Sequence, residues 1–186
     1  MEPKRAERRR GWARLIPVLF LCASVGITAG RCAGSPYAAF NRGVALIQKG
    51  KTEQAEPYLF QAVHTDAKNA EAWNQLGIIA YERQDWDEAE LRFRKAYDLN
   101  RRSAVYPRNL AYVYAERKQY SLAKPLLKRS LELEPSDPET WTALAKIAFL
   151  QGRKPEAAAT LRKALGIDPA YLEAIHLLSR LGNETK

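Results

Sequence analysis

The side chains that could perform catalysis are few in this sequence and widely separated. The two histidines, His64 and His176, lie far apart, and neither belongs to an HExxH motif. The other titratable candidates are pairs of carboxylates, Asp87 with Glu88 and Glu132 with Glu134, in segments where a solvated helix face is expected. No phosphate-binding loop, GxGxxG motif or nucleophile elbow is present. Because catalysis requires converging polar groups, we predict no enzyme, no metal site, no cofactor and no small-molecule substrate.

Both cysteines, Cys22 and Cys32, precede the part of the chain that has the pattern of a folded domain. Residues 36–186 therefore contain no thiol, no disulfide and no cysteine ligand for a metal ion. This usage is compatible with an oxidising compartment but does not require one.

The first 30 residues have the composition of an export signal. A basic stretch that ends at Arg14 precedes the uncharged run Leu15–Gly30, which closes on small residues. This run is long for the core of a signal peptide and short for a bilayer span, which takes about 20 residues. Residues 1–30 are therefore predicted to be a cleaved signal peptide or a retained signal anchor, with residues 31–35 as a linker.

Two more specific export routes fit the sequence less well. Lipid attachment needs a small residue before the cysteine, whereas Cys22 follows a leucine and Cys32 follows an arginine. The pair Arg9-Arg10 only faintly resembles a twin-arginine signal, since arginine runs are common in basic leaders. The basic excess predicts that the N-terminus stays cytoplasmic. The remainder is then expected to be extracytoplasmic, either membrane-anchored or secreted, and periplasmic in a bacterium with two membranes.

The positive charge of the chain is concentrated in this leader. Lys and Arg number 30 against 21 Asp and Glu, which gives a formal charge of +9. Residues 1–35 hold seven basic and two acidic residues, and so account for +5 of that excess. The remaining +4 is ordinary for a domain of this size, so we predict no nucleic-acid partner.

The rest of the chain repeats itself every 34 residues, in the blocks 36–69, 70–103, 104–137 and 138–171. The blocks place large apolar and small residues on one face of two successive helical stretches, although the first block diverges most, with Ala39 and Arg42 at two positions where the second and fourth blocks have a tryptophan and a leucine. These residues are Trp73, Leu76, Gly77, Ala89, Phe93 and Ala96 in the second block, and Trp141, Leu144, Ala145, Ala157, Leu161 and Ala164 in the fourth. Small residues let two helices approach closely, while large residues fill the remaining gaps. Gly50 and Gly152 suit the left-handed residue that ends a helix.

This period and pattern are similar to those of the tetratricopeptide repeat (TPR) family, over residues 36–171. The resemblance implies an all-α fold, a right-handed superhelical solenoid of four TPR helix pairs. Residues 172–186 continue the register and are predicted to form a capping helix and tail, which brings the expected number of helices to nine. In that helix Ala174, Ile175 and Leu178 are apolar, while Glu173 and Arg180 are expected to face outward.

In TPR proteins the first helices of successive repeats line a concave groove that binds a protein or peptide partner. Carried over position by position, the resemblance implies that Phe40, Asn74, Ile78, Tyr81, Arg108, Tyr112 and Lys146 contact the partner. The family's clamp for a C-terminal carboxylate is matched only by Asn109, so we expect an extended or helical segment with apolar anchors instead. Two alternatives stay open: some of these side chains cover neighbouring helices, or the N-terminal segment occupies the groove.

These features predict a non-catalytic scaffold or adaptor that binds a protein partner and contacts the membrane through its N-terminal segment. Its use in a cell-envelope assembly, such as a pilus or secretion system, follows from family analogy alone. A second hypothesis is a structural subunit of a membrane complex, or a self-associating module, that captures no free ligand.

Overall fold

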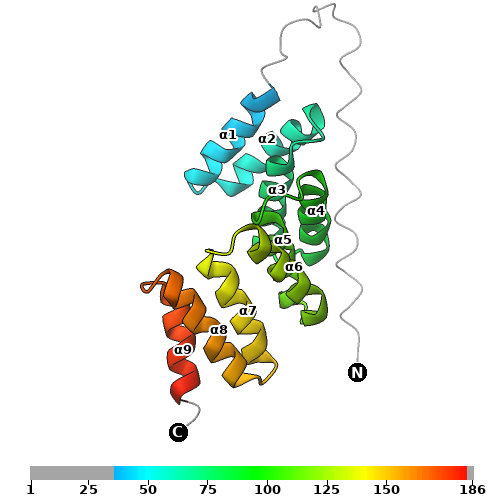
Figure 1. Cartoon of the computed structure of the whole chain (residues 1–186). Coiled ribbons are helices and arrows are strands. Elements are labelled where there is room, and N and C mark those ends of the chain that lie inside the picture. The colour runs from blue at the N-terminus through cyan, green and yellow to red at the C-terminus, as the bar shows by residue number, and fades with distance from the viewer. Residues whose placement is uncertain (1–35, 184–186) are drawn as a thin grey trace, which may run out of the picture. The chain divides into compact units, whose positions relative to one another are not determined.

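The computed structural model describes residues 36–183, which form nine helices and no strand (Figure 1). The helices are α1 (Pro36–Gln48), α2 (Thr52–Thr65), α3 (Ala70–Glu82), α4 (Trp86–Leu99), α5 (Val105–Glu116), α6 (Tyr120–Leu133), α7 (Pro138–Leu150), α8 (Lys154–Ile167) and α9 (Leu172–Asn183). The predicted all-α fold with nine helices is confirmed over this part of the chain. The predicted signal or anchor segment lies outside the described residues.

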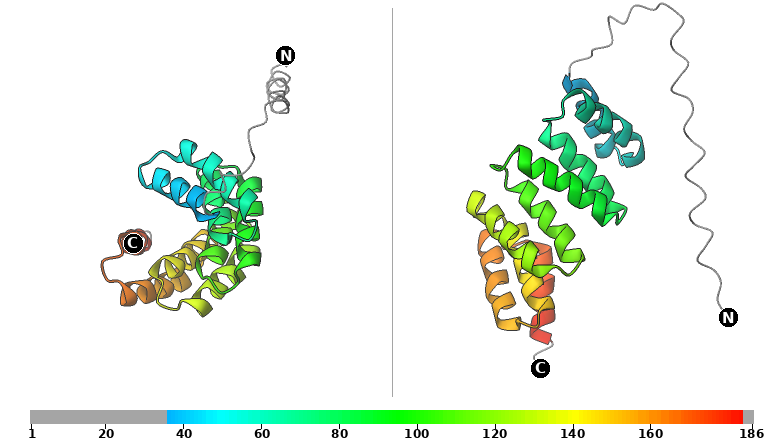
Figure 2. Two further views of the ribbon diagram at one scale, coloured as in Figure 1. Left: turned by 90° about the horizontal axis from the view of Figure 1, so that it is seen from above. Right: turned by 90° about the vertical axis from the view of Figure 1, so that its right-hand side faces the viewer.

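Consecutive helices pack as pairs, α1 with α2, α3 with α4, α5 with α6 and α7 with α8. Each pair contacts the next, and the first helices α3, α5, α7 and α9 also contact one another in that order. Seen from above, the pairs follow a curved path (Figure 2, left). This arrangement is the predicted helical solenoid, in which the first helices share one side.

The turn inside each helix pair contains one residue with a positive φ angle. Gly50 and Gly152 have φ values of 70° and 76°, so the sequence prediction of a left-handed residue is confirmed at both glycines. The equivalent places in the second and third repeats are held by Gln84 and Lys118, with φ values of 60° and 59°. The repeat therefore imposes the left-handed conformation even where no glycine provides it freely.

Close approach of the paired helices depends on a small residue in the first helix. A Cβ atom added to Gly77 in α3 would lie 2.6 Å from Cδ1 of Phe93 in α4. The same position in the first repeat is Gly43, where a Cβ atom would lie 2.8 Å from Cδ2 of Leu59. Since Leu59 is fully buried and Phe93 is only 2% exposed, neither side chain has room to move aside.

We therefore expect Gly77→Ala to lower the free energy of unfolding by about 1–3 kcal/mol, because the added methyl group overpacks the α3–α4 contact. Gly166→Ala in α8 is the matched control, since a Cβ atom there meets nothing within 4 Å. That control should gain about 0.5–1 kcal/mol from helix propensity. Urea denaturation of both variants measures the difference. Equal effects would show that the helices do not approach as closely as described.

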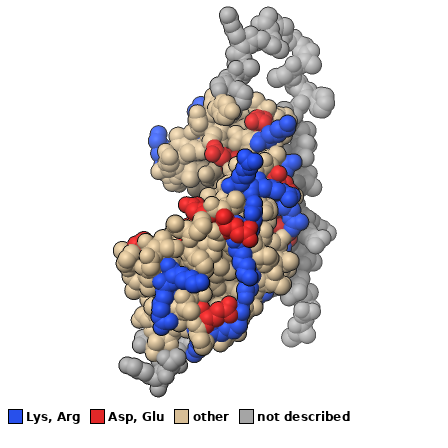
Figure 3. Space-filling model, in the orientation of Figure 1, with Lys and Arg blue, Asp and Glu red and all other residues tan. Residues whose placement is uncertain are grey.

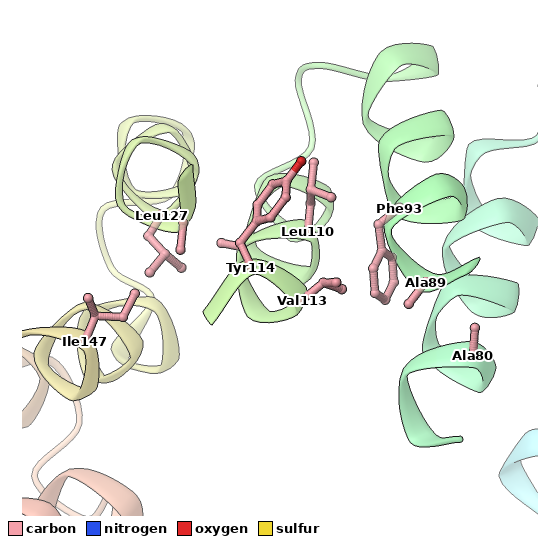
Figure 4. Close-up of a cluster of buried hydrophobic side chains, with 10 residues drawn as sticks. Ala80, Ala89, Phe93, Leu110, Val113, Tyr114, Leu127 and Ile147 are labelled. Atoms are coloured by element: carbon pink, nitrogen blue, oxygen red, sulfur yellow. The ribbon is translucent and has the colours of Figure 1, made fainter. Parts of the chain in front are cut away.

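The largest cluster of buried apolar side chains runs through the middle of the solenoid, from α3 to α7 (Figure 4). Its labelled members are Ala80, Ala89, Phe93, Leu110, Val113, Tyr114, Leu127 and Ile147. Because it draws on five successive helices, this cluster fixes the first helices α3, α5 and α7 relative to one another. Those three helices carry six of the seven residues predicted to contact a partner.

Helix α9 covers the fourth repeat largely as its sequence predicts, because Ala174 is buried, Leu178 packs against the same cluster, and Glu173 and Arg180 are exposed. Ala174 is fully buried, together with Leu177 and Leu181, in the cluster formed with α7 and α8. Ile175, an apolar residue of the predicted register, is instead 38% exposed. Leu177 and Leu181, which the prediction did not include, supply further apolar side chains for the contact of α9 with α7 and α8.

None of the helices within residues 36–183 combines the length and the apolar character that crossing a bilayer requires.

Candidate partner-binding cleft

The first helices bring three of the seven predicted groove residues into one open cleft. Tyr81 from α3, Tyr112 from α5 and Lys146 from α7 line this cleft, which has a volume of about 320 Å³. Its other lining residues are Ala115, Glu116, Leu127, Glu139, Ala143, Ile147, Leu150 and Glu173. We call this surface the tyrosine cleft. Its lining comes from the first helices α3, α5, α7 and α9 and from Leu127 of α6.

The two tyrosines are held in position by contacts within the cleft. The Tyr81 hydroxyl donates to Oε1 of Glu116 at 3.3 Å, and its ring meets Trp86 edge-on with centroids 5.2 Å apart. The Tyr112 hydroxyl donates to Oε1 of Glu139 at 2.9 Å. Both side chains are half-buried, so each presents part of an ordered aromatic surface at little further cost in conformational entropy.

Burial and nearby carboxylates keep both phenols neutral well into alkaline solution. Burial, with Glu116 adding a smaller effect, raises the pKa of Tyr81 to about 12. Burial, followed by the charge of Glu139, raises the pKa of Tyr112 well above its ordinary value of about 10. A raised pKa means that the folded state favours the protonated phenol. This stabilisation is complete below the pKa of the unfolded chain and disappears as the pH rises through the folded pKa.

We therefore expect Tyr112→Phe to lose less stability than the wild-type protein between pH 9 and pH 12, because phenylalanine cannot ionise. Urea midpoints measured across this range test the prediction, with each protein compared with its own value at pH 8. A decline of equal size in both proteins would show that ionisation of Tyr112 does not limit alkaline stability.

Arg108 lies beside the tyrosine cleft but is already engaged by two carboxylates. Its Nη1 atom lies 2.7 Å from Oδ2 of Asp137 and 2.9 Å from Oε2 of Glu139. Asp137 also accepts a hydrogen bond from the backbone N–H of Glu139 at 3.1 Å and caps the start of α7. The Thr140 hydroxyl donates to the same carboxylate. Arg108 therefore links α5 to the start of α7, and it reaches the cleft through Glu139.

The remaining predicted residues lie elsewhere. Phe40 and Asn74 line a second cleft of about 410 Å³, between α1, α3 and the start of α5. Asn74 is buried, and its Oδ1 accepts a hydrogen bond from Nδ2 of Asn109 at 2.8 Å. Ile78 packs against the central core cluster, as do Tyr81 and Tyr112, so these side chains also cover neighbouring helices, which is one of the alternatives that the sequence left open. Neither Ile78 nor Arg108 lines the tyrosine cleft.

The charge of the tyrosine cleft is the feature that sequence reasoning overlooked. Glu116, Glu139 and Glu173 face a single cation, Lys146, which gives the lining a formal charge of −2. Glu116 and Glu139 occupy groove positions of the repeat, and Glu173 stands in α9 where Glu139 stands in α7. Counting the charges at these positions, rather than searching them for aromatic residues, would have revealed the acidic lining.

Outside the cleft, acidic and basic side chains are interleaved. Figure 3 shows Lys and Arg gathered in a band over the middle helices, with Asp and Glu among them. Ion pairs within this part of the chain include Arg94 with Glu90 at 2.6 Å and Arg117 with the same glutamate at 2.8 Å. The tyrosine cleft thus carries an acidic excess, whereas the remainder of residues 36–186 carries a basic excess.

The fold and the cleft define a helical-repeat protein with an open cleft on the side of its first helices. Two family models, each described as tetratricopeptide repeat, match residues 35–104 and 114–181. The chain therefore belongs to the tetratricopeptide repeat family. Proteins of this family typically act as protein-interaction scaffolds, bind protein or peptide partners and are generally non-catalytic.

The chain is also similar to known relatives and to solved structures. The human protein O-mannosyl-transferase TMTC3 is 27% identical over 149 residues, which is 78% of this chain and 16% of the relative. The Cut9–Hcn1 hetero-tetramer of the anaphase-promoting complex contains a chain with a TM-score of 0.72 and 25% identity, over 77% of this chain and 29% of that one. Pseudomonas aeruginosa pilF has a TM-score of 0.73 at 22% identity, over 81% of this chain and 68% of that one, and shows similarity of fold alone. The chain therefore spans about a sixth of the length of its human relative.

Proposed function

We propose that this protein is a non-catalytic scaffold that captures a segment of a partner protein in the tyrosine cleft. The observation that supports this proposal is the convergence of Tyr81, Tyr112 and Lys146, from three successive repeats, on one open cleft. Aromatic side chains that are already ordered are the usual anchors of protein interfaces. A segment lying across α3, α5 and α7 would contact several repeats at once, which a solenoid surface allows.

The partner segment is basic, with apolar residues between its charges. The formal charge of −2 attracts Lys and Arg and disfavours a C-terminal carboxylate. Arg108, the other cation near the cleft, is neutralised by Asp137 and Glu139 and cannot also serve an anionic ligand. Leu150 is 54% exposed at the rim and, with Ala143, offers the apolar contact.

Reversing the charge of the cleft tests this capture. Glu116→Lys with Glu173→Lys changes the formal charge of the lining from −2 to +2, and we expect roughly a tenfold or greater loss of co-purified partner. The full-length tagged chain is expressed in its source cells at matched levels, and its partners are quantified by mass spectrometry. Asp98→Lys with Glu132→Lys makes the same change of charge on exposed sites of α4 and α6. Equal losses in both variants, or no loss in either, would contradict cleft capture.

We further propose that the repeats lie outside the cytoplasm, in a protein that is either membrane-anchored or secreted. There the protein would bind components of a cell-envelope assembly. The support for this placement is the basic and then apolar sequence of residues 1–30. The intact mass of the C-terminally tagged chain, measured in membrane and soluble fractions, tests it. A mass lacking about 30 residues indicates a cleaved signal. A full-length mass that stays with alkali-washed membranes indicates an anchor. A full-length mass in the soluble cytoplasm contradicts both.

A further inference from the structure

The second helices of the third and fourth repeats carry an excess of basic residues. Helix α6 has three Lys or Arg residues against one Glu, and α8 has the same numbers, so together they carry a formal charge of +4. In the first two repeats, α2 has two acidic residues and no Lys or Arg, and α4 has three basic against four acidic residues, which gives −3 in total. Because all four helices occupy the same place in their repeats, the repeat pattern does not require this difference.

The basic side chains of α6 and α8 share one outer surface. Fully buried Ser130 marks the inner side of α6, and Lys128, two residues earlier, is exposed on the opposite side. Arg162 holds the same position of the repeat in α8 and is exposed as well. The Nζ atom of Lys124 lies 3.9 Å from Oε1 of Glu156, so the two helices lie side by side near their first turns. We call this surface the basic face. Its cations are Lys124, Lys128, Arg129, Arg162 and Lys163.

The two carboxylates of α6 and α8 are already paired with cations close to them in the sequence. Oε2 of Glu132 lies 2.9 Å from Nη1 of Arg129, three residues earlier. Oε2 of Glu156 lies 2.6 Å from Nη1 of Arg153, also three residues earlier. These acidic groups therefore do not neutralise the remaining cations of the basic face.

Three cations of the basic face keep an uncompensated charge. Lys128 and Arg162 have no carboxylate partner within residues 36–183. The Nζ atom of Lys163 lies over the ring of Trp141, 4.8 Å from its centroid, and this contact leaves the ammonium charge in place. Long basic side chains at exposed positions keep their charged ends in water, where an anionic surface can reach them.

The composition of the basic face is better suited to a lipid surface than to a nucleic acid or a protein. Proteins that bind single-stranded nucleic acid stack its bases on aromatic rings. Helix α8 contains no aromatic residue, and the one in α6, Tyr120, packs against the central core cluster. Protein interfaces are depleted in lysine and anchored by aromatic residues. Leu122 in α6 and Ile167 in α8 are 49% and 39% exposed, and such side chains can enter the headgroup layer of a bilayer.

We propose that the basic face docks on the surface of a bilayer that contains anionic phospholipids. The choice of a bilayer rests on the proposed membrane placement of the chain. Residues 31–35 reach at most about 18 Å when fully extended, so a retained anchor would hold the repeats close to the headgroups. Anionic headgroups attract Lys and Arg within a Debye length, which is about 10 Å at 0.1 M salt.

Docking in this way leaves the tyrosine cleft open to a partner. The cleft lies on the side where the first helices α3, α5, α7 and α9 contact one another, whereas the basic face belongs to the second helices. The acidic lining of the cleft would be repelled by anionic headgroups, which reinforces the same orientation. The bilayer and the partner segment therefore bind separate surfaces of opposite charge.

Quenching by spin-labelled lipid headgroups measures this contact. With Cys22 and Cys32 replaced by serine, a fluorophore is attached at Ala159→Cys, exposed on α8, or at Ala143→Cys in the tyrosine cleft. The full chain is added to phosphatidylcholine vesicles, with or without about one-third phosphatidylglycerol, and vesicle-bound protein is isolated by flotation. We expect at least about threefold stronger quenching at position 159 in the anionic vesicles, and loss of this difference in about 0.5 M salt. Quenching at position 143 should be the same in both kinds of vesicle.

Reversing two cations of the basic face should abolish the difference between the vesicles. Lys128→Glu with Arg162→Glu removes two cations, each of which adds about fivefold to binding at an anionic surface, so quenching at position 159 should fall to its value in neutral vesicles. Lys49→Glu with Lys68→Glu makes the same change of charge at exposed sites of the first repeat and should retain the difference. Because all four side chains are exposed, circular dichroism should show both variants folded.

Three results would overturn the proposal. The first is equal quenching at position 159 in both kinds of vesicle. The second is stronger quenching in anionic vesicles that the reversal of Lys128 and Arg162 does not reduce. The third is loss of that quenching when a short DNA duplex is added at a matched phosphate concentration, which would identify a nucleic acid as the preferred partner.

The same experiment separates this proposal from the proposed function. Flotation with neutral vesicles depends on residues 1–30, and not on the basic face. A chain that floats only with anionic vesicles therefore supports docking of the basic face and contradicts a membrane anchor. Glu116→Lys with Glu173→Lys, which is expected to prevent partner capture, lies outside the basic face and should leave the quenching at position 159 unchanged.

Discussion

Asp137→Ala is expected to lower the free energy of unfolding by about 3–5 kcal/mol, the range found when one partner of a buried ion pair is removed. Asp137 is 9% exposed and is bound by three groups. It pairs with Arg108, caps the start of α7 and accepts the hydroxyl hydrogen of Thr140, a side chain that is fully buried. Alanine removes all three contacts and leaves the Arg108 guanidinium with Glu139 as its carboxylate partner.

Urea denaturation of the full chain measures this loss. Asp98→Ala is the control, because Asp98 also pairs with an arginine, Arg101, at 2.8 Å but is 53% exposed. An exposed pair contributes at most about 1 kcal/mol, so this variant should be nearly as stable as the wild type. A loss below about 1.5 kcal/mol for Asp137→Ala would show that water solvates Arg108 readily and that the α5–α7 link is weak.

The double variant Tyr81→Ala with Tyr112→Ala is expected to weaken partner binding by at least about a hundredfold, which is roughly 2.7 kcal/mol. Central aromatic residues dominate the energetics of protein interfaces, and these two form the aromatic wall of the cleft. Removing them also releases Glu116 and Glu139 from the hydroxyl groups that hold them.

Two controls separate binding from folding in that experiment. Tyr58→Ala removes a tyrosine of α2 whose ring stacks on Arg42, 4.6 Å away and outside the tyrosine cleft. It should retain partner binding. Circular dichroism and thermal unfolding of the double variant show whether its helices remain intact. Partner binding that survives in a folded double variant would mean that the tyrosine cleft is not the binding surface.

The sequence predicts the repeat and its helices well, because the residues that determine each helix pair lie close together along the chain. Gly77 and Phe93 belong to neighbouring helices of one repeat, and their spacing determines which faces meet. The sequence also locates Tyr81 and Tyr112 on the first helices, so their presence on one side of the solenoid follows from the repeat. Whether these residues contact a partner stays a prediction.

The contacts between repeats are the part that the sequence does not reveal. Arg108 occupies a groove position, but Asp137, just before the next repeat, turns it into a structural link between α5 and α7. Asn74 is paired in the same way with Asn109 of the following repeat. Such partners are about 30 residues away along the chain. Whether a groove side chain pairs with a neighbouring side chain or stays available to a ligand therefore depends on how the helices stack.

The most direct test of partner capture in the tyrosine cleft is photo-crosslinking in the source cells. In the full-length protein, one alanine at a time is replaced by a photo-crosslinking amino acid. Ala143 lies in the tyrosine cleft, and Ala159 is exposed on α8 and outside it. We predict protein adducts from position 143 and few from position 159, with the crosslinked partner segments rich in Lys and Arg. Equal adducts at both positions, or segments from position 143 that are acidic, would contradict the proposal that this cleft captures a basic partner segment.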